Sequence, residues 1–325
     1  IDTKGKIFID ICIEDIKEPG TSAYSLFHLV VRTRPTFNAY SENGLPNDVG
    51  GNHPVEEVKS KGFYTSQLSY LTGSLGLTHK LDFITKGLSA KVRYSGTRNF
   101  SLEKRLSLPY TMYRFDADGN ITGTKIEGTK TAYSESFEGE KSYVANISLN
   151  YGRTFNNVHN ITGLALYEQS EGFGDSFWAS RTNYISNGIA QLFAGGDEDK
   201  NNNGEGYETG RKSWLGRVTY DFNNRYLFET SVRCDASVLF PEKGRWGIFP
   251  SVSMGWVISE EKFMKQFSAL DFLKIRASYG QLGNDRGINP FQFISTYRYT
   301  NGAVIGDEIT KGLEQGVEPN PDITW

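Results

Sequence analysis

The sequence is poor in cysteine, in proline and in long apolar runs. Cys12 and Cys234 are the two cysteines among 325 residues, too few for a disulfide scaffold and not spaced as a CxxC pair. No apolar run approaches the roughly 18–20 residues that a membrane helix requires. The net charge of -3 and the pI of about 5.9 indicate no overall basic field. These absences argue against a disulfide-rich domain, membrane-spanning helices and a nucleic-acid partner.

Signatures of catalysis and of cofactor binding are also missing. The four histidines are scattered without paired metal-ligand spacing, and no GxSxG elbow occurs. The segment GTKIEGTKT has Thr129 where a phosphate-binding loop requires lysine. We therefore predict that the chain is not an enzyme and binds no cofactor.

What the sequence does contain points to β-strands. Aromatic residues make up 14% of the chain and glycines number 35, a mixture that suits twisted strands joined by tight turns. Large apolar residues alternate with small or polar ones in about nine windows. We therefore predict an all-β chain of about nine antiparallel strands. The clearest windows are 7–14, 88–95, 143–151, 213–222, 226–235, 251–256 and 273–280.

Strand length, aromatic placement and loop order favour a membrane barrel over a soluble sandwich. Several windows run to about ten residues, as tilted membrane strands do. Aromatic residues bracket the turn at 223–224, and Tyr143 and Tyr151 lie at the two ends of one strand, as in an interfacial girdle. Long and short connections alternate, as they do between the extracellular and periplasmic ends of outer-membrane barrels. The long ones are 15–69, 97–140 and 169–211, and the short ones are 82–87, 153–158 and 223–224. A moderately long connection, 236–247, and the connection 259–271, with a predicted short amphipathic helix, follow them.

The charged residues of the predicted strands fall on one side. A lysine or arginine facing lipid at the midplane would cost roughly 2–4 kcal/mol, whereas a watery lumen tolerates it. The same alternation puts Cys12 on the polar face and Cys234 on the apolar face, so we expect no disulfide between them. The sequence thus predicts part of an up-and-down transmembrane β-barrel. The charged residues on the predicted lumenal face are Lys91, Arg93, Arg217, Glu229, Arg233, Lys274 and Arg276.

The last third of the chain also carries specific motifs. RCDASVLFPEKGRWGIFPSVSMGWVISEEKFM at 233–264, LDFLKIRASYGQLGN at 270–284 and NPDITW at 320–325 resemble the barrel region of SusC/RagA-type TonB-dependent outer-membrane transporters. Two upstream segments, at 32–44 and 81–95, resemble the same family. Cys234 departs from the pattern, because the family usually has tyrosine there. The motif residues for which the resemblance implies a structural role are Arg233, Asp235, Arg245, Trp246, Phe249, Pro250 and Trp256.

The resemblance implies a barrel of about 22 strands that encloses an N-terminal plug. Residues 1–325 would then be a piece from the middle of the barrel. We expect the plug domain, the TonB box, the signal peptide and the C-terminal strands to lie outside this piece. The resemblance further implies uptake of oligosaccharides or peptides across the outer membrane, with a SusD-like surface lipoprotein and TonB as partners. A passive porin or barrel adhesin, and a soluble β-rich glycan-active protein, are the alternatives.

Three aromatic residues are candidates for contact with a ligand or a partner. Phe173, Phe177 and Trp178 lie in EGFGDSFWAS, at the start of a long predicted outer loop. Exposed rings of this kind stack on sugars or pack against a partner, and they also anchor loops. The sequence leaves both interpretations open.

One acidic loop has a partial calcium-binding pattern. Asp199, Asn201 and Asn203 are spaced as the first, third and fifth positions of a calcium loop. Gly210 stands where the bidentate glutamate belongs, so a solvated loop tip is the alternative interpretation, and we expect no other metal site. DADGN, at 116–120, predicts a hairpin turn.

Overall fold

A computed structural model describes residues 2–264, 266 and 270–325. Within these residues, nine strands form one antiparallel sheet in the order β1-β2-β3-β6-β7-β8-β9-β10-β11. Consecutive strands of the sheet are neighbours, which confirms the predicted up-and-down arrangement of about nine strands. The strands are β1 (Thr3–Pro19), β2 (Gly62–Lys80), β3 (Leu88–Ser107), β6 (Ala132–Phe155), β7 (His159–Thr182), β8 (Asn201–Phe222), β9 (Tyr226–Ser237), β10 (Trp246–Val257) and β11 (Lys274–Gly280).

The remaining elements are short and belong to the connections. Two hairpins, β4–β5 and β12–β13, form separate two-stranded sheets. No helix among the described residues is both long and apolar enough to cross a membrane. These elements are α1 (Ala23–Arg32), α2 (Pro54–Lys59), β4 (Tyr110–Phe115), β5 (Ile121–Glu127), β12 (Tyr297–Ile305), β13 (Glu308–Gln315) and the 3₁₀ turns η1 (Leu192–Ala194), η2 (Glu242–Gly244) and η3 (Ile258–Glu260).

The predicted strand length of about ten residues is wrong for the first six strands of the sheet. These strands contain 17 to 24 residues, and only β9, β10 and β11 are shorter, with 12, 12 and 7. At about 3.3 Å per residue, a strand of 24 residues is about 80 Å long, far more than a bilayer core of about 30 Å requires. The predicted loops were correspondingly too wide, because their first and last residues belong to strands.

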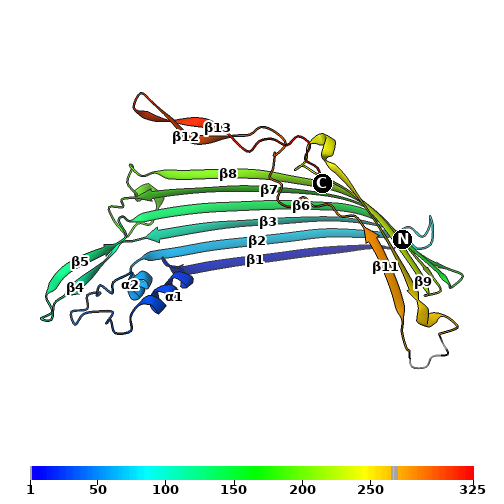
Figure 1. Cartoon of the computed structure of the whole chain (residues 1–325), viewed down its shortest axis with the longest axis horizontal. Coiled ribbons are helices and arrows are strands. Elements are labelled where there is room, and N and C mark those ends of the chain that lie inside the picture. Colours follow the sequence, from blue (N-terminus) through cyan, green and yellow to red (C-terminus); the bar gives the residue numbers. More distant parts are fainter. Residues whose placement is uncertain (1, 265, 267–269) are drawn as a thin grey trace.

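The order of long and short connections is confirmed for the first three pairs but not for the last, because the connection 238–245, predicted to be moderately long, is shorter than the connection 258–273 that follows it. The long connections 20–61, 108–131 and 183–200 join the strands at one end of the sheet, where α1, α2 and the β4–β5 hairpin also lie (Figure 1). The connections 81–87, 156–158, 223–225 and 258–273 lie at the other end, near the N-terminus (Figure 1).

The tightest turns have a clear local cause. Asn223 and Asn224 have φ of 53° and 56°, and Asn156 and Asn157 have 48° and 57°. Two consecutive residues with positive φ match the right-handed twist of the flanking strands, and asparagine adopts this conformation more readily than most residues.

Two other local predictions can be compared with the structure. The turn at 116–120 joins β4 to β5 as predicted, and Asp116 Oδ1 accepts hydrogen bonds from the amides of Asp118 and Asn120. The predicted helix in 259–271 appears only as the 3₁₀ turn η3 at its start. Part of that prediction, at 265 and 267–269, lies outside the described residues.

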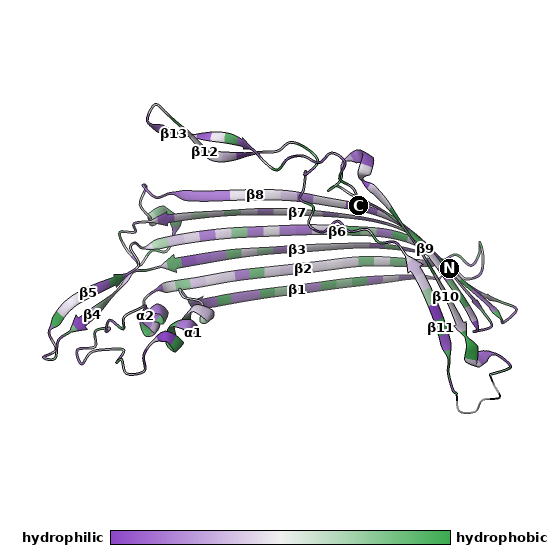
Figure 2. Cartoon of the chain, viewed as in Figure 1, coloured by the Kyte–Doolittle hydropathy of each residue, from purple (hydrophilic) through white to green (hydrophobic). Residues whose placement is uncertain are grey.

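The β-ladder confirms the two predicted faces. All seven charged residues of the predicted lumenal face share one face of the sheet, since cross-strand partners such as Arg93–Asn146 and Glu229–Ser253 point the same way. Hydrophilic and hydrophobic bands alternate along the strands (Figure 2). Cys12, in β1, lies on the polar face and Cys234, in β9, on the apolar face, and both are free.

Among the residues that the structure describes, none forms a protein core beneath the apolar face. Ile7, Ile147 and Met254 are 76%, 54% and 59% exposed, although each lies within the sheet. Buried side chains cluster instead under the long connections, where Met112, Tyr133 and Phe240 are almost fully covered. Exposed aliphatic side chains on one whole face of a sheet fit contact with hydrocarbon, which is the predicted environment.

Two rows of aromatic side chains border the apolar band. Toward the long connections, Tyr94 stacks on Tyr143 at 6.1 Å between ring centroids. The Tyr167–Trp214 pair, at 4.6 Å, lies four residues further in, level with Ile147. Toward the short turns, the rings are those of His159, Tyr220, Phe222 and Tyr226. Tyr143 and Tyr151 are about 26 Å apart along β6, which matches the roughly 25 Å height of the lipid-facing band of outer-membrane barrels.

Candidate functional site on the polar face and outer loops

A polar hollow lies on the polar face near the short turns. It has a volume of about 270 Å³ and is lined by strands β8 to β11. Asp221 and Glu229 bring negative charge to it from β8 and β9, and Lys274 and Arg276 bring positive charge from β11. A surface with both signs of charge favours a polar solute or a polar protein segment over an apolar one.

The first family-motif residues form an ion pair on the same face. Arg233 Nε lies 2.8 Å and 2.7 Å from the two carboxylate oxygens of Asp235. Arg233 Nη2 also donates to Ser213 Oγ at 3.4 Å on the neighbouring strand β8. The alternation of β9 places residues 233 and 235 on one face, so their pairing follows from the strand itself.

The two C-terminal motifs meet in space although they are far apart in the sequence. Trp325 lies 4.9 Å from Phe240 and 5.4 Å from Phe249 between ring centroids, and its Nε1 donates to the Arg245 carbonyl oxygen at 2.8 Å. Arg245 Nε in turn donates to the Phe240 carbonyl oxygen at 3.5 Å. This aromatic cluster fastens Trp325 to the residues at the start of β10.

The other motif residues belong to the wall of the sheet. Trp246 is half exposed on the apolar face, and Trp256 Nε1 donates to Glu261 Oε1 at 3.2 Å next to the short turns. Pro250 accepts a hydrogen bond from the Gln281 amide at 3.0 Å, just beyond the last paired residues of β10 and β11. A proline lacks the amide donor, and it is tolerated here because the ladder ends at this point.

The aromatic candidates do not lie in a loop as predicted. Phe173, Phe177 and Trp178 belong to β7 and are paired on both sides, with β6 and β8. Phe173 and Phe177 point to the apolar face, where Phe177 stacks on Phe137 at 5.3 Å. Trp178 points to the polar face and is 38% exposed. The strand therefore divides the three rings between its two faces.

The calcium pattern is also not formed as predicted. Asn201 and Asn203 are in strand β8 rather than in a loop. The Asp199 carboxylate accepts from Lys130 Nζ and Thr182 Oγ1, each at 2.7 Å, and these contacts hold the pKa of Asp199 below its usual value. Among residues 2–264, 266 and 270–325, no group of three or more His, Cys, Asp or Glu side chains is placed to hold a metal ion. Asp199 thus ties the 183–200 connection to Lys130.

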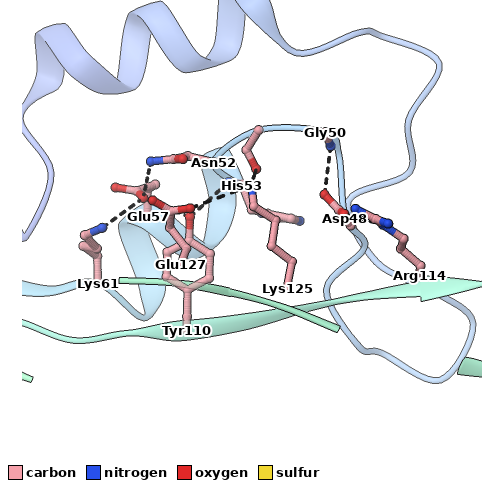
Figure 3. Close-up of polar contacts among 11 residues, drawn as sticks. Asp48, Gly50, Asn52, His53, Glu57, Lys61, Tyr110, Arg114, Lys125 and Glu127 are labelled. Carbon is pink, nitrogen blue, oxygen red and sulfur yellow. Dashed lines mark hydrogen bonds and ion pairs between the residues drawn. The ribbon is translucent and has the colours of Figure 1, made fainter. Parts of the chain in front are cut away.

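A buried polar network, which the sequence did not indicate, holds the outer connections together. Glu57 of α2 is only 3% exposed and accepts from Tyr110 Oη at 2.9 Å and from Asn52 Nδ2 at 3.2 Å (Figure 3). Lys61 Nζ lies 3.4 Å from the same carboxylate (Figure 3). The Tyr110 hydroxyl in turn accepts from the His53 amide at 3.1 Å. The connection 20–61 is therefore fastened to the β4–β5 hairpin.

The electrostatics of this network favour an ionised Glu57. Burial acts to raise its pKa, but the hydrogen bonds from Thr21 and Tyr110 and the charge of Lys61 outweigh burial, so the pKa lies below its usual value. Burial raises the pKa of Tyr110, with a further contribution from the Glu57 carboxylate. In the same region, burial and the carboxylate of Glu56 raise the pKa of Tyr40 to about 12. Both tyrosines are therefore neutral hydrogen-bond donors.

One local signal in the sequence could have indicated part of this network. His53 caps α2 through Nδ1, Pro54 follows at the first helical position, and Glu56 and Glu57 lie in the first turn. A cap, a proline and two acidic residues in this order are a helix start. The link to Tyr110 joins residues far apart in sequence, and no local pattern reveals it.

Comparisons with known proteins agree with this geometry. No family model matches the chain. TonB-dependent receptor P39 of Formosa agariphila is 38% identical over 188 residues, which cover 55% of this chain and 17% of the relative. TonB-dependent receptor SusC of Bacteroides thetaiotaomicron is 39% identical over 89 residues, which cover 27% of this chain and 9% of the relative. The chain is therefore similar to TonB-dependent receptors, and the matched residues span less than a fifth of the length of these two relatives.

Solved structures share the fold of this chain. The structure of the RagAB peptide transporter aligns with a TM-score of 0.74 at 20% identity and covers 99% of this chain and 35% of that one. The RagAB peptide importer in its "open-open" state aligns with a TM-score of 0.75 at 19% identity, with the same coverage. The chain thus corresponds to about a third of the length of those solved structures.

Proposed function

We propose that this chain forms part of the barrel wall of an importer that carries oligosaccharides or peptides across the bacterial outer membrane. The observation that carries the proposal is the division of the sheet into two faces. One face exposes aliphatic side chains between two aromatic rows, and the other holds all seven charged residues of the predicted lumenal face. A wall between lipid and a watery passage requires this division.

The proposal includes the parts of the protein outside residues 1–325. The plug, the TonB box, the signal peptide and further barrel strands belong to those parts, and TonB supplies the energy for uptake. A SusD-like surface lipoprotein covers the end of the barrel that carries the long connections. Support comes from the relatives, which are TonB-dependent receptors, and from solved structures that are described as peptide transporters. None of these relatives is described as an enzyme.

The polar face offers contacts for either class of cargo. Its charged groups of both signs suit the termini and side chains of a peptide. Trp178, in the part of β7 beyond the outer aromatic row, presents a ring that suits the face of a sugar. We propose Trp178 as the contact residue among the three aromatic candidates, because Phe173 and Phe177 point to the outer surface.

Uptake measurements in the source bacterium test the proposal. Deletion of the gene abolishes uptake of at least one labelled oligosaccharide or peptide, and the full-length gene restores it. An uncoupler that removes the proton-motive force also abolishes uptake, because TonB requires it. Uptake that survives the uncoupler points instead to a passive porin. A deletion strain that takes up every glycan and peptide at the parental rate contradicts the proposal.

A further inference from the structure

A shallow hollow opens on the apolar face where two glycines lie side by side. Gly73 of β2 is the cross-strand partner of Gly96 of β3, and a Cβ added at Gly73 would meet no heavy atom within 4 Å. The hollow has a volume of about 470 Å³. Because both glycines lack side chains, the surrounding rings and aliphatic groups form its walls. The apolar walls are Ile9, Leu71, Leu75, Tyr94 and Tyr143.

Two cations lie at the side of the hollow that faces the long connections. Arg98 lines the hollow, and its direct cross-strand partner on β6 is Lys141. Like charges in this position repel each other and destabilise a sheet. Neither side chain forms an ion pair with any residue that the structure describes, although Lys141 Nζ lies 5.1 Å from the centre of the Phe173 ring. An anion between the two cations would relieve this repulsion.

The carboxylates on the same face lie too far from Arg98 to serve as the anion between the two cations. Glu171 and Asp175 are on β7, opposite Tyr143 and Gly139, and thus one strand further from Arg98 than Lys141 is. Glu171 is in addition an acceptor for Gln169 Nε2 at 2.8 Å. The anion that suits Arg98 and Lys141 together must therefore come from outside the described residues.

The depth of the two cations in the membrane indicates the source of the anion. The stacked rings of Tyr94 and Tyr143 belong to the outer aromatic row, where the hydrocarbon ends. Lys141 lies two residues further out along β6 than Tyr143, which is about 7 Å. That distance places both cations among the lipid headgroups, directly above an apolar hollow.

We propose that this hollow binds an anionic, phosphate-bearing lipid of the surrounding membrane. The acyl chain lies over Gly73 and Gly96, and the phosphate lies between Arg98 and Lys141. Charge complementarity supports this occupant. The apolar chain of the lipid matches the apolar hollow, and its anionic group matches the two cations next to the hollow. The inference rests on the proposed function, because it requires the apolar face to contact the membrane.

Native mass spectrometry of the full-length protein tests the site. The protein is released from micelles that contain equal amounts of phosphatidylglycerol and phosphatidylcholine, and the ratio of the two retained lipids is measured. The wild-type protein retains the anionic lipid preferentially. Arg98→Gln combined with Lys141→Gln lowers the ratio by about 25-fold, because each basic side chain near a membrane surface contributes about fivefold. Lys104→Gln is the matched control on the same face of β3, further from the membrane, and leaves the ratio unchanged.

A second variant tests the hollow separately from the charges. Gly73→Val places a branched side chain in the hollow, at a position where an added Cβ meets no heavy atom within 4 Å, and leaves both cations in place, so it reduces the total amount of retained lipid at least severalfold. Lipid retention equal to the wild type in the double glutamine variant overturns the inference, and so does full retention in an assembled Gly73→Val protein. If Gly73→Val does not assemble, the double glutamine variant decides alone.

The two proposals fail in different ways. Protein that is absent from the outer-membrane fraction contradicts the proposed function and the inference together. Protein that reaches the membrane and imports its substrate, but retains lipid independently of Arg98 and Lys141, contradicts only the inference.

Discussion

A single charge placed on either face of β6 distinguishes a lipid-facing wall from a soluble sheet. Ile147 is midway between Tyr143 and Tyr151, about 13 Å along the strand from each aromatic residue. It is 54% exposed, so substitution removes little protein packing. Arginine at this position would face hydrocarbon at the middle of the bilayer. The adjacent residue, Asn146, points to the opposite face and provides the matched site.

The expected cost of Ile147→Arg is about 2–4 kcal/mol in the free energy of folding into a bilayer. This corresponds to a change of about 25- to 700-fold in the equilibrium constant. Asn146→Arg changes the same free energy by no more than about 0.5 kcal/mol, because the new guanidinium meets the lumen. Its cross-strand partners there are Glu168 on β7 and Arg93 on β3, one of each sign.

Folding of the full-length protein into lipid vesicles across a urea series measures both values. The folded fraction is followed by the mobility shift of unboiled samples on a gel. Equal effects of Ile147→Arg and Asn146→Arg, or a larger effect of Asn146→Arg, would show that the apolar face does not contact lipid. The assignment of the two faces would then be incorrect.

Three further predictions concern the outer network and the cysteines. Tyr110→Phe removes the hydrogen bond to the buried Glu57 and destabilises the outer connections by about 1–3 kcal/mol. Limited proteolysis of whole cells then cuts the 20–61 connection faster than in the wild type, and an unchanged rate would contradict the structural role of the network. The stability of the same connections depends on pH through Glu57, whose pKa in the folded protein is below its ordinary value of 4.5. Its contribution is fully present above pH 4.5 and is lost as the pH falls through the folded pKa, so protease resistance declines below about pH 4.5 and Glu57→Gln makes that decline smaller. A decline that already begins near pH 6 would assign the effect to another group. Treatment of the full-length protein with an oxidant yields no bond between Cys12 and Cys234, because the ladder separates them onto different faces and distant strands. Detection of the linked peptides by mass spectrometry would show that the strand register is wrong.

The membrane-crossing part of the fold was predictable from the sequence, and the outer part was not. Within the bilayer, one face of each strand meets hydrocarbon and the other meets water, so residues such as Val92 and Arg93 alternate and the pattern is visible. Beyond the outer aromatic row both faces meet water, and the alternation disappears. The start of β8 reads NNNGEG and is hydrophilic throughout (Figure 2). Such residues have low strand propensity, and pairing with β7 overrides it.

The candidate site residues show the same contrast between the membrane-crossing part of the sheet and the outer part. The face of the polar charges could be assigned, because strand alternation is a local signal. The two incorrect predictions, the loop aromatics and the calcium loop, both fall in the outer part of the sheet, where Trp178 and Asn203 are cross-strand partners. The network around Glu57 depends on Tyr110, which a local pattern cannot bring to it.

The length of the strands determines how much of the side of this protein is accessible to other molecules. β6 continues from Tyr143 to Ala132, about 35 Å along the strand, which leaves a height of about 25 Å above the lipid even at a tilt of 45°. The outer side of the strands above the lipid, including the exposed ring of Phe177, contacts the surrounding medium. Antibodies, phages and neighbouring surface proteins can therefore contact this side of the protein without touching its long connections.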